Sequence, residues 1–351
     1  MATTAGRLAV LCALVLIGAG CGRAAPSSPS SADVALYDGQ DRIQRLTDGA
    51  KREGALTIYT SAQTNDLGPV VEAFEKKYGV RVTVWRAGSE AVLTRAIQES
   101  RAGRHTVDVV ETNGPELESL HREQILQRVT SPHQGDLIAP AVLPHGEWVG
   151  TRLNVFVQAY NTKLVKKEEL PKTWEDLRDS RWKGRLGIEQ EDSDWLAGVI
   201  NELGEERGTR LFRDIVAANG ISVRKGHTLL TQLVASGEVP LALTVYNYKA
   251  EQLRAQGAPI GWFTIGKAIA RPNGVAVARR APHPYAAVLF YDFELSEEGQ
   301  RIIAARDFVP TSRRIDTPLN RVPMTFVDAR VSIDEYDKWK NLYLSLFGGD
   351  R

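Results

Sequence analysis

The chain has 351 residues, 43% of them hydrophobic, and its 44 Lys and Arg residues nearly balance 43 Asp and Glu residues, for a net charge of +1. This balance excludes the strongly basic surfaces with which proteins bind nucleic acid or anionic membranes. The only two cysteines are Cys12 and Cys21, which excludes a disulfide framework and a cysteine-based metal site. Packing of ordinary side chains must therefore stabilise the fold.

The first twenty-one residues predict export. Arg7 precedes an apolar run from Leu8 to Ile17, which is too short to span a bilayer and is typical of a secretory signal. The segment 18–21, Gly-Ala-Gly-Cys, resembles the lipobox of bacterial lipoproteins, although Gly18 stands where Leu, Val or Ile is usual. We expect residues 1–20 to be a signal peptide and Cys21 to be acylated and to anchor the protein to a membrane of the cell envelope. Ordinary secretion is the alternative.

The segment after Cys21 predicts a flexible spacer. Residues Gly22 to Ala32 are rich in Ser, Ala and Pro and contain no large apolar side chain. We expect residues 21–49 to form a lipidated tether and N-terminal segment that precedes the folded body.

Strand and helix patterns then alternate along the chain. The periodicity predicts strands at 56–59, 80–84 and 107–110, and helices over 69–78, over 89–103 with Ser89 as its cap, and from Pro115 onward. This β-α-β order favours a mostly parallel sheet covered by helices.

The second half continues the same α/β pattern. We expect strands at 185–189, 221–224, 241–246 and 274–278, and helices at 194–203, 205–219, 228–236, 285–295 and 297–306. Capping boxes at Thr173–Asp176 and Ser332–Glu335 predict two further helix starts, the second opening a final helix that reaches Phe347. About 300 residues exceed one comfortable core, so two lobes are expected.

Polar residues follow three predicted strands and precede helices. The open ends of parallel strands, next to helix N-termini, are where such sheets bind ligands, and the helix dipole there favours an oxyanion. Ordinary helix capping by the same residues remains open. The residues are Ser61, Ala62, Gln63 and Thr64; Thr112, Asn113 and Gly114; and Gly226, His227 and Thr228.

Four segments stand out when they are taken together in their order and spacing. They are 50–63 (AKREGALTIYTSAQ), 107–114 (VDVVETNG), 233–248 (LVASGEVPLALTVYNY) and 295–301 (LSEEGQR), the last followed by FVPT at 308–311. Together they resemble the ferric-iron-type solute-binding proteins of ABC importers. The resemblance implies two α/β lobes of the periplasmic binding protein-like II class, joined by crossing strands and closing on a ligand. It places lobe I at 50–152 plus 272–325 and lobe II at 153–271 plus 326–351. It also implies an ABC permease and its ATPase as partners, a monomeric chain, and no cofactor.

Iron-binding members of this family hold the metal with two adjacent tyrosines, commonly with a His and a Glu. Here Tyr248 matches the second tyrosine, while Asn247 stands in the place of the first. Gln63 stands near the expected His, and Asn113 replaces the expected Glu. Most of the family's iron ligands are therefore missing.

Two ligand hypotheses remain open. In the first, the cleft takes a small polar or anionic organic solute: Tyr246 and Tyr248 supply hydroxyl groups and an aromatic wall, Trp195 faces them, and Arg152 and Lys225 pair with a carboxylate or phosphonate. Core packing of Trp195 and a surface role of Arg152 are the structural alternatives.

The second hypothesis is ferric iron. Tyr246 and Tyr248, spaced by two, would point to one side of a strand and bind the metal together with Glu111.

The enzyme motifs in the chain are incomplete. Ser180–Lys183 matches S-x-x-K without its companion motifs, and Gly261–Lys267 matches a phosphate-loop pattern but is followed by Ala268 instead of Ser or Thr. We expect no enzyme. An exported lipoprotein hydrolase and a two-lobed sensor are the alternatives from other classes.

Overall fold

The computed structural model of the chain describes residues 2 and 30–348. The predicted signal peptide from residue 3 onward, the lipidation site Cys21 and most of the predicted spacer lie outside these residues. Among the residues that it describes, no helix has both the length and the apolar character needed to cross a membrane.

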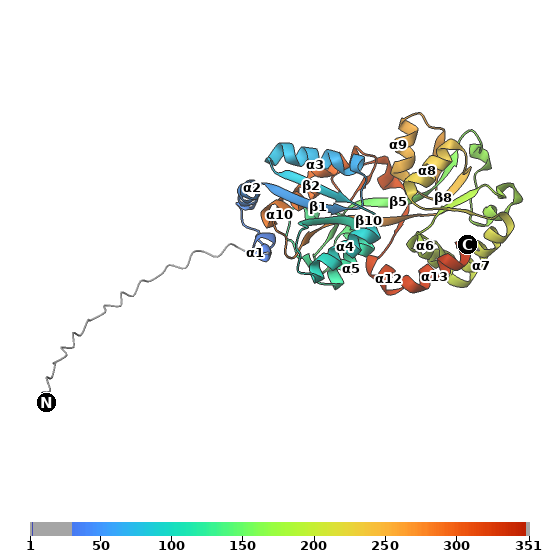
Figure 1. Ribbon diagram of the computed structural model, residues 1–351. Coiled ribbons are helices and arrows are strands. Elements are labelled where there is room, and N and C mark those ends of the chain that lie inside the picture. The colour runs from blue at the N-terminus through green and yellow to red at the C-terminus, as the bar shows by residue number, and fades with distance from the viewer. Residues whose placement is uncertain (1, 3–29, 349–351) are drawn as a thin grey trace.

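A mixed sheet runs through the length of the folded body, with helices packed around it (Figure 1). Its strand order is β2-β1-β3-β10-β5-β8-β6-β7. These strands are β1 (Ala55–Thr60), β2 (Arg81–Arg86), β3 (Val109–Asn113), β5 (Val149–Asn161), β6 (Leu186–Glu189), β7 (Ser222–Arg224), β8 (Leu241–Tyr246) and β10 (Ala268–Ala278). Shorter strands pair at the sides: β4 (Leu126–Gln127), β9 (Ile260–Phe263), β11 (Val309–Pro310) and β12 (Met324–Phe326).

Two long strands join two groups of parallel strands. β1 pairs in parallel with β2 and β3, and β6 pairs in parallel with β7 and β8. β5 and β10 lie between the groups, antiparallel to each other, and almost every residue along them is buried. β10 was predicted only over 274–278, and β5 was expected only through the crossing strands that the resemblance implies. Burial on both faces removes the alternation that identifies a half-buried strand. The two-lobed α/β fold is thereby confirmed, and the lobe boundaries at 152/153 and 271/272 stay a prediction.

The helices are distributed over both groups of strands. They are α1 (Ser31–Ala35), α2 (Arg42–Glu53), α3 (Thr64–Tyr78), α4 (Ser89–Arg101), α5 (Gly114–Arg122), α6 (Ser193–Leu203), α7 (Glu205–Asn219), α8 (His227–Ser236), α9 (Asn247–Ala255), α10 (Pro284–Leu295), α11 (Glu297–Ala304), α12 (Ala329–Asp334) and α13 (Tyr336–Phe347). Short 3-10 helices occupy Gln134–Asp136, Ala139–Ala141, Lys167–Glu169, Glu175–Arg178, Ser180–Trp182 and Pro318–Arg321.

Several predicted helix starts were wrong. α3 begins at Thr64, so Pro69 lies inside the helix; Asp66 in its first turn is held 2.8 Å from the Lys249 ammonium of α9, a distant contact that no local pattern reveals. Gly88, and not Ser89, is the N-cap of α4, because the Ser89 hydroxyl is engaged by the Asn113 amide.

The two predicted capping boxes also differ from the structure. At the first, the Asp176 carboxylate accepts the backbone N–H groups of Lys172 and Thr173, but the element that follows is a 3-10 helix. At the second, Ser332 lies within α12, and the last helix begins at Tyr336. The Glu335 carboxylate there accepts the Trp339 indole N–H at 2.6 Å instead of closing a capping box.

The N-terminal segment that the structure describes is folded onto the body. α1 and α2 pack against α10, and the buried Arg42 guanidinium lies 2.9 Å from the Asp292 carboxylate. Ser31 and Ala32, which were predicted to belong to the spacer, are helical because Ser30 caps α1 with its hydroxyl.

The C-terminal segment touches both groups of strands through their helices. α12 packs on α5, whereas α13 packs on α6 and α7 (Figure 1). Surface ion pairs Arg122–Asp334 and Lys338–Glu205, both at 2.6 Å, fasten the two helices to these neighbours.

Candidate functional site

A cleft of about 1850 Å³ opens between the two groups of strands, with β5 and β10 contributing to its base. Residues of both groups line it, which is the arrangement that the predicted ligand site requires. The predicted site residues that line it are Ser61, Ala62, Gln63, Asn113, Arg152, Lys225, His227, Thr228, Tyr246 and Tyr248.

Five predicted site residues do not line the cleft: Thr64, which is the first residue of α3, Glu111, Trp195, Thr112 and Gly114. Trp195 is 1% exposed and packs edge-on against Trp174 and Phe212, so it belongs to the core. Thr112 is buried and donates its hydroxyl to the Ser61 oxygen at 3.0 Å, so it positions a cleft residue. A Cβ on Gly114 would meet the Pro272 carbonyl oxygen at 3.2 Å, so this glycine serves close packing.

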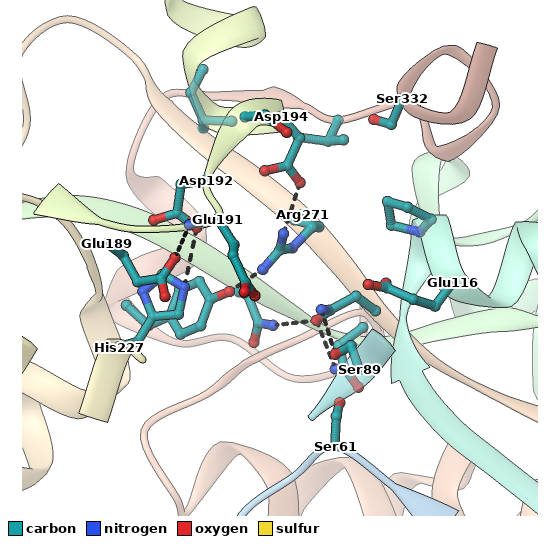
Figure 2. Close-up of a pocket in the computed structure, with 18 of the residues that line it drawn as sticks. Ser61, Ser89, Glu116, Glu189, Glu191, Asp192, Asp194, His227, Arg271 and Ser332 are labelled. Carbon is teal, nitrogen blue, oxygen red and sulfur yellow. Dashed lines mark hydrogen bonds and ion pairs between the residues drawn. The ribbon is translucent and has the colours of Figure 1, made fainter. Parts of the chain in front are cut away.

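The first wall of the cleft, formed by the ends of β1 and β3 and the start of α4, carries hydroxyl and amide groups. The Asn113 amide donates to the Ser89 hydroxyl at 2.8 Å. Its carbonyl oxygen accepts from Asn154 of β5 at 3.2 Å and from Asn273 of β10 at 3.3 Å. Ser61 and Ser89 lie close together on this wall in Figure 2. The network fixes the amide orientations and presents neutral donors and acceptors to the cleft.

Glu116, in the first turn of α5, adds a buried ionisable group to this wall. Burial raises the pKa of Glu116 to about 7, although Arg271 acts in the opposite direction. One carboxyl oxygen is buried and has no hydrogen-bond partner. A carboxyl group in this state is partly protonated near neutral pH and can donate as well as accept.

Arg271 of β10 lies at the base of the cleft (Figure 2). One terminal nitrogen lies 2.9 Å from the Asp194 carboxylate, another donates to the Tyr246 hydroxyl, and the buried Nε–H has no acceptor. Burial by itself lowers the pKa of Arg271, but Asp194 raises it well above its usual value, so the guanidinium is charged. Such a group presents an oriented donor to an oxyanion.

Three ionisable groups form the opposite wall, at the end of β6 and the start of α8. The Asp192 carboxylate lies 3.2 Å from His227 Nε2, and Glu189 accepts the backbone N–H groups of Gly226 at 2.7 Å and Glu191 at 2.5 Å. Burial raises the pKa of Glu189. Burial lowers the pKa of His227, but the neighbouring Asp192 carboxylate raises it more, so the pKa of His227 is raised overall. Donor atoms of Glu189, Asp192 and His227 lie within 4.8 Å of one another, so these residues could hold a cation.

The two cleft tyrosines do not lie on one strand, contrary to the prediction. Tyr246 ends β8 and Tyr248 falls in the first turn of α9. Their rings nevertheless stack at 5.8 Å with an interplanar angle of 14°, and Tyr248 also packs on Phe308. Burial raises the pKa of both phenols, so both are protonated in the absence of a ligand.

Glu111 is buried below the cleft and does not line it. The Arg152 guanidinium of β5 donates to it, as does the Thr60 hydroxyl. Glu294, 3.9 Å from Arg152, completes the buried group, and burial and Glu111 raise the pKa of its carboxyl. Of the predicted iron ligands, the structure therefore brings Tyr246 and Tyr248 together in the cleft, whereas Glu111 is engaged below it.

Lys225 and the enzyme motifs lie away from the base of the cleft. Lys225 stands on the rim with a largely exposed side chain, 3.7 Å from Glu191. Ser180 and Lys183 are exposed and do not line the cleft. Lys267 is followed by strand β10, whereas a phosphate loop is followed by a helix.

The sequence interpretation missed Arg271, Asp194, Asn154 and Asn273. A usable signal existed for two of them: Arg271 and Asn273 share one face of the extended run 268–278, where charged and amide side chains interrupt apolar residues. Asp194 and Asn154 carried no local signal, because their roles arise from contacts across the cleft.

The chain is similar in sequence and in fold to known proteins. Residues 106–340 match the family model described as bacterial extracellular solute-binding protein. Iron uptake protein A1 of Synechocystis is 25% identical over 321 residues, covering 86% of this chain and 87% of its own. The crystal structure of iron-bound HitA from Pseudomonas aeruginosa superposes with a TM-score of 0.73 at 22% identity, covering 83% of this chain and 99% of that one. The structure of AfuA from Actinobacillus pleuropneumoniae, with fructose-6-phosphate bound, superposes with a TM-score of 0.74 at 21% identity. It covers 85% of this chain and 100% of that one.

Proposed function

Because the chain belongs to the bacterial extracellular solute-binding proteins, we propose that its cleft captures a small polar or anionic solute with a carboxylate- or phosphonate-like group. Proteins of this family are binding components of ABC importers and act together with a permease and an ATPase. The solute of this chain would be handed to such a permease without any bond being made or broken.

Arg271 is the observation that carries the proposal. Its guanidinium is charged, nearly buried and held in place by Asp194, yet its Nε–H lacks an acceptor. A buried cationic donor without a partner is costly, and an oxyanion in the cleft would supply the missing acceptor. Arg152 likewise lines the cleft with an unpartnered Nε–H.

The remaining cleft residues fit the polar part of such a solute. Ser61 and Ser89 offer hydroxyls, the Asn113 network offers amides, and the stacked rings of Tyr246 and Tyr248 offer an aromatic wall. A solute that touches both walls favours the closed arrangement of the lobes, since its differential affinity drives closure.

Ferric iron is the second candidate, and a specific observation favours it. Glu189, Asp192 and His227 gather oxygen and nitrogen donors next to Tyr246, with 3.8 Å between the His227 and Tyr246 ring centres. The relative from Synechocystis is named an iron uptake protein. Against it, iron needs deprotonated phenolates, whereas burial raises the pKa of both tyrosines and Arg271 engages the Tyr246 hydroxyl.

A thermal-shift screen separates the candidates. Citrate, methylphosphonate, sugar phosphates, spermidine and ferric citrate would be tested against the wild type, Arg271→Lys and the matched control Arg301→Gln, whose side chain is exposed on α11. A ligand that binds only the folded state raises the melting temperature by mass action. The proposal expects a shift with an iron-free anion that Arg271→Lys diminishes and Arg301→Gln retains. A shift only with ferric citrate, together with a visible tyrosinate-to-iron band, would establish the iron candidate instead.

The other classes make different predictions. A lipoprotein hydrolase would turn over an ester and lose that turnover in Ser180→Ala. A sensor would bind its solute equally well but work with a signalling membrane partner in place of a permease.

A further inference from the structure

A second cluster of histidine and carboxylate groups lies outside the cleft, at the C-terminal end of α5. Glu118 and His121 are three residues apart on this helix and therefore share one of its faces. His145, from the loop before β5, stacks on His121 with ring centres 3.8 Å apart and an interplanar angle of 13°. Neither histidine nor Glu118 lines the cleft.

We propose that Glu118, His121 and His145 form a binding site for a divalent transition-metal ion of the zinc class, separate from the solute site. One donor atom from each residue lies within 4.8 Å of the others. Tetrahedral zinc, with metal–ligand distances of about 2.0–2.2 Å, separates its ligand atoms by roughly 3.3 Å. Small side-chain rotations therefore bring the three donors onto one ion.

The hydrogen bonds around the cluster orient both rings toward Glu118 and Glu147. His145 Nδ1 accepts the backbone N–H of Glu147 at 3.1 Å, so the ring proton is on Nε2, which faces the Glu118 carboxylate at 3.2 Å. For Nε2 to bind a metal ion, this proton must move to Nδ1 and the hydrogen bond from the Glu147 N–H must be given up. His121 Nδ1 lies 2.7 Å from the Glu147 carboxylate, which leaves its Nε2 for a metal. In zinc sites, the free ring N–H of a metal-bound histidine commonly donates to a carboxylate, which fixes the orientation of the ring.

The surroundings of the cluster suit a cation. The Glu118 side chain is 4% exposed; one oxygen accepts the Trp148 indole N–H at 3.3 Å and the other lies 3.6 Å from Arg122. The histidine side chains are 28% and 16% exposed, so an ion can enter and water can fill its fourth position.

Zinc titration of the tag-free, EDTA-treated protein by calorimetry tests this site. We expect one Zn²⁺ to bind, with affinity at least about a hundredfold weaker in His121→Gln and His145→Gln, and about tenfold to a hundredfold weaker in Glu147→Gln. His105→Gln is the matched control outside the cluster and should bind Zn²⁺ like the wild type. His227→Gln reports whether any Zn²⁺ binds in the cleft instead.

Two results would overturn the proposal. One is that the wild type binds no Zn²⁺. The other is that the double variant H121Q/H145Q binds Zn²⁺ with unchanged affinity, as it would if the ion were lost only in His227→Gln. Should the variants fold poorly by circular dichroism, NMR of the wild type decides. Zn²⁺ must shift the ring signals of His121 and His145 and leave those of His105 in place.

Discussion

Arg152 and Arg271 stand on the two crossing strands at the base of the cleft, yet their surroundings differ. Arg152 is paired below the cleft with the fully buried Glu111, with Glu294 close by. Arg271 is paired with Asp194 and Tyr246, both of which line the cleft. The first guanidinium chiefly neutralises carboxylates inside one group of strands, whereas the second presents its charge to the cleft. A charged cleft residue can therefore serve the fold, the ligand or both, and its partners indicate which.

The sharpest way to break this comparison is Arg152→Gln. It leaves Glu111 buried without its cation, so we expect the free energy of unfolding to fall by about 3–5 kcal/mol. Urea denaturation followed by circular dichroism measures the loss. The exposed Arg301→Gln should change stability by less than about 0.5 kcal/mol. A comparably small effect at Arg152 would mean that the ion pair does not stabilise the fold.

Arg271→Lys tests the other half of the comparison. Lysine keeps a positive charge near Asp194 but lacks the planar fork, so stability should change little. Affinity for the anion identified by the thermal-shift screen should fall by about tenfold to a hundredfold, or about 1.4–2.8 kcal/mol. Calorimetric titration measures it, and equal affinity in both proteins would remove Arg271 from the proposed site.

Glu116→Gln tests whether burial in the cleft wall makes the free energy of unfolding depend on pH. Burial raises the pKa of Glu116 from 4.5 to about 7, so the unfolded chain loses this proton first as the pH rises. The stability that the protonated carboxyl contributes is complete below pH 4.5 and is lost as the pH rises toward 7. At pH 8 we expect Glu116→Gln to be more stable than the wild type, because glutamine carries no charge that burial penalises. The expected difference is limited to about 1–2 kcal/mol, since part of the side chain faces cleft water.

The measurement for Glu116 is the difference between wild-type and variant unfolding free energies from pH 4 to pH 8. Other raised carboxyl groups, such as Glu189 and Glu294, contribute equally to both proteins and cancel. A difference that stays constant across this range would show that Glu116 titrates as an ordinary surface glutamate.

Tyr248→Phe is expected to have the smallest effect. It removes one hydroxyl and keeps the ring that packs on Tyr246 and Phe308. A neutral hydrogen bond contributes about 0.5–1.5 kcal/mol, so affinity for the solute should fall several-fold with little loss of stability. An unchanged dissociation constant would restrict Tyr248 to its aromatic role.

Local patterns were sufficient to predict the α/β architecture. Helices such as α7 and α8 and strands such as β1 and β8 follow from apolar spacing and from glycines at helix ends. Strand ends also indicated the first wall, because Ser61 and Asn113 follow β1 and end β3. The long crossing strands were harder to recognise, since burial on both faces removes the alternation that identifies a strand.

Residues whose roles depend on distant partners were not predictable in this way. Trp195 and Tyr246 are both aromatic residues near a helix start, and only the packing of Trp195 on Phe212 separates core from cleft. Asp194 and Arg271 are 77 residues apart in sequence. Their pairing depends on packing α6 beside β10, which no local window of the sequence contains.

The C-terminal helices couple the two halves of the molecule mechanically. α12 packs on α5, α13 packs on α6 and α7, and only Glu335 separates the two helices. A rotation of one half relative to the other would therefore have to bend the chain at Glu335 or break one of these helix contacts. In an opening motion, these contacts would limit how far the two groups of strands could separate. The rate at which a solute enters and leaves the cleft would then depend on this joint, whose neighbours Ile333 and Tyr336 themselves line the cleft.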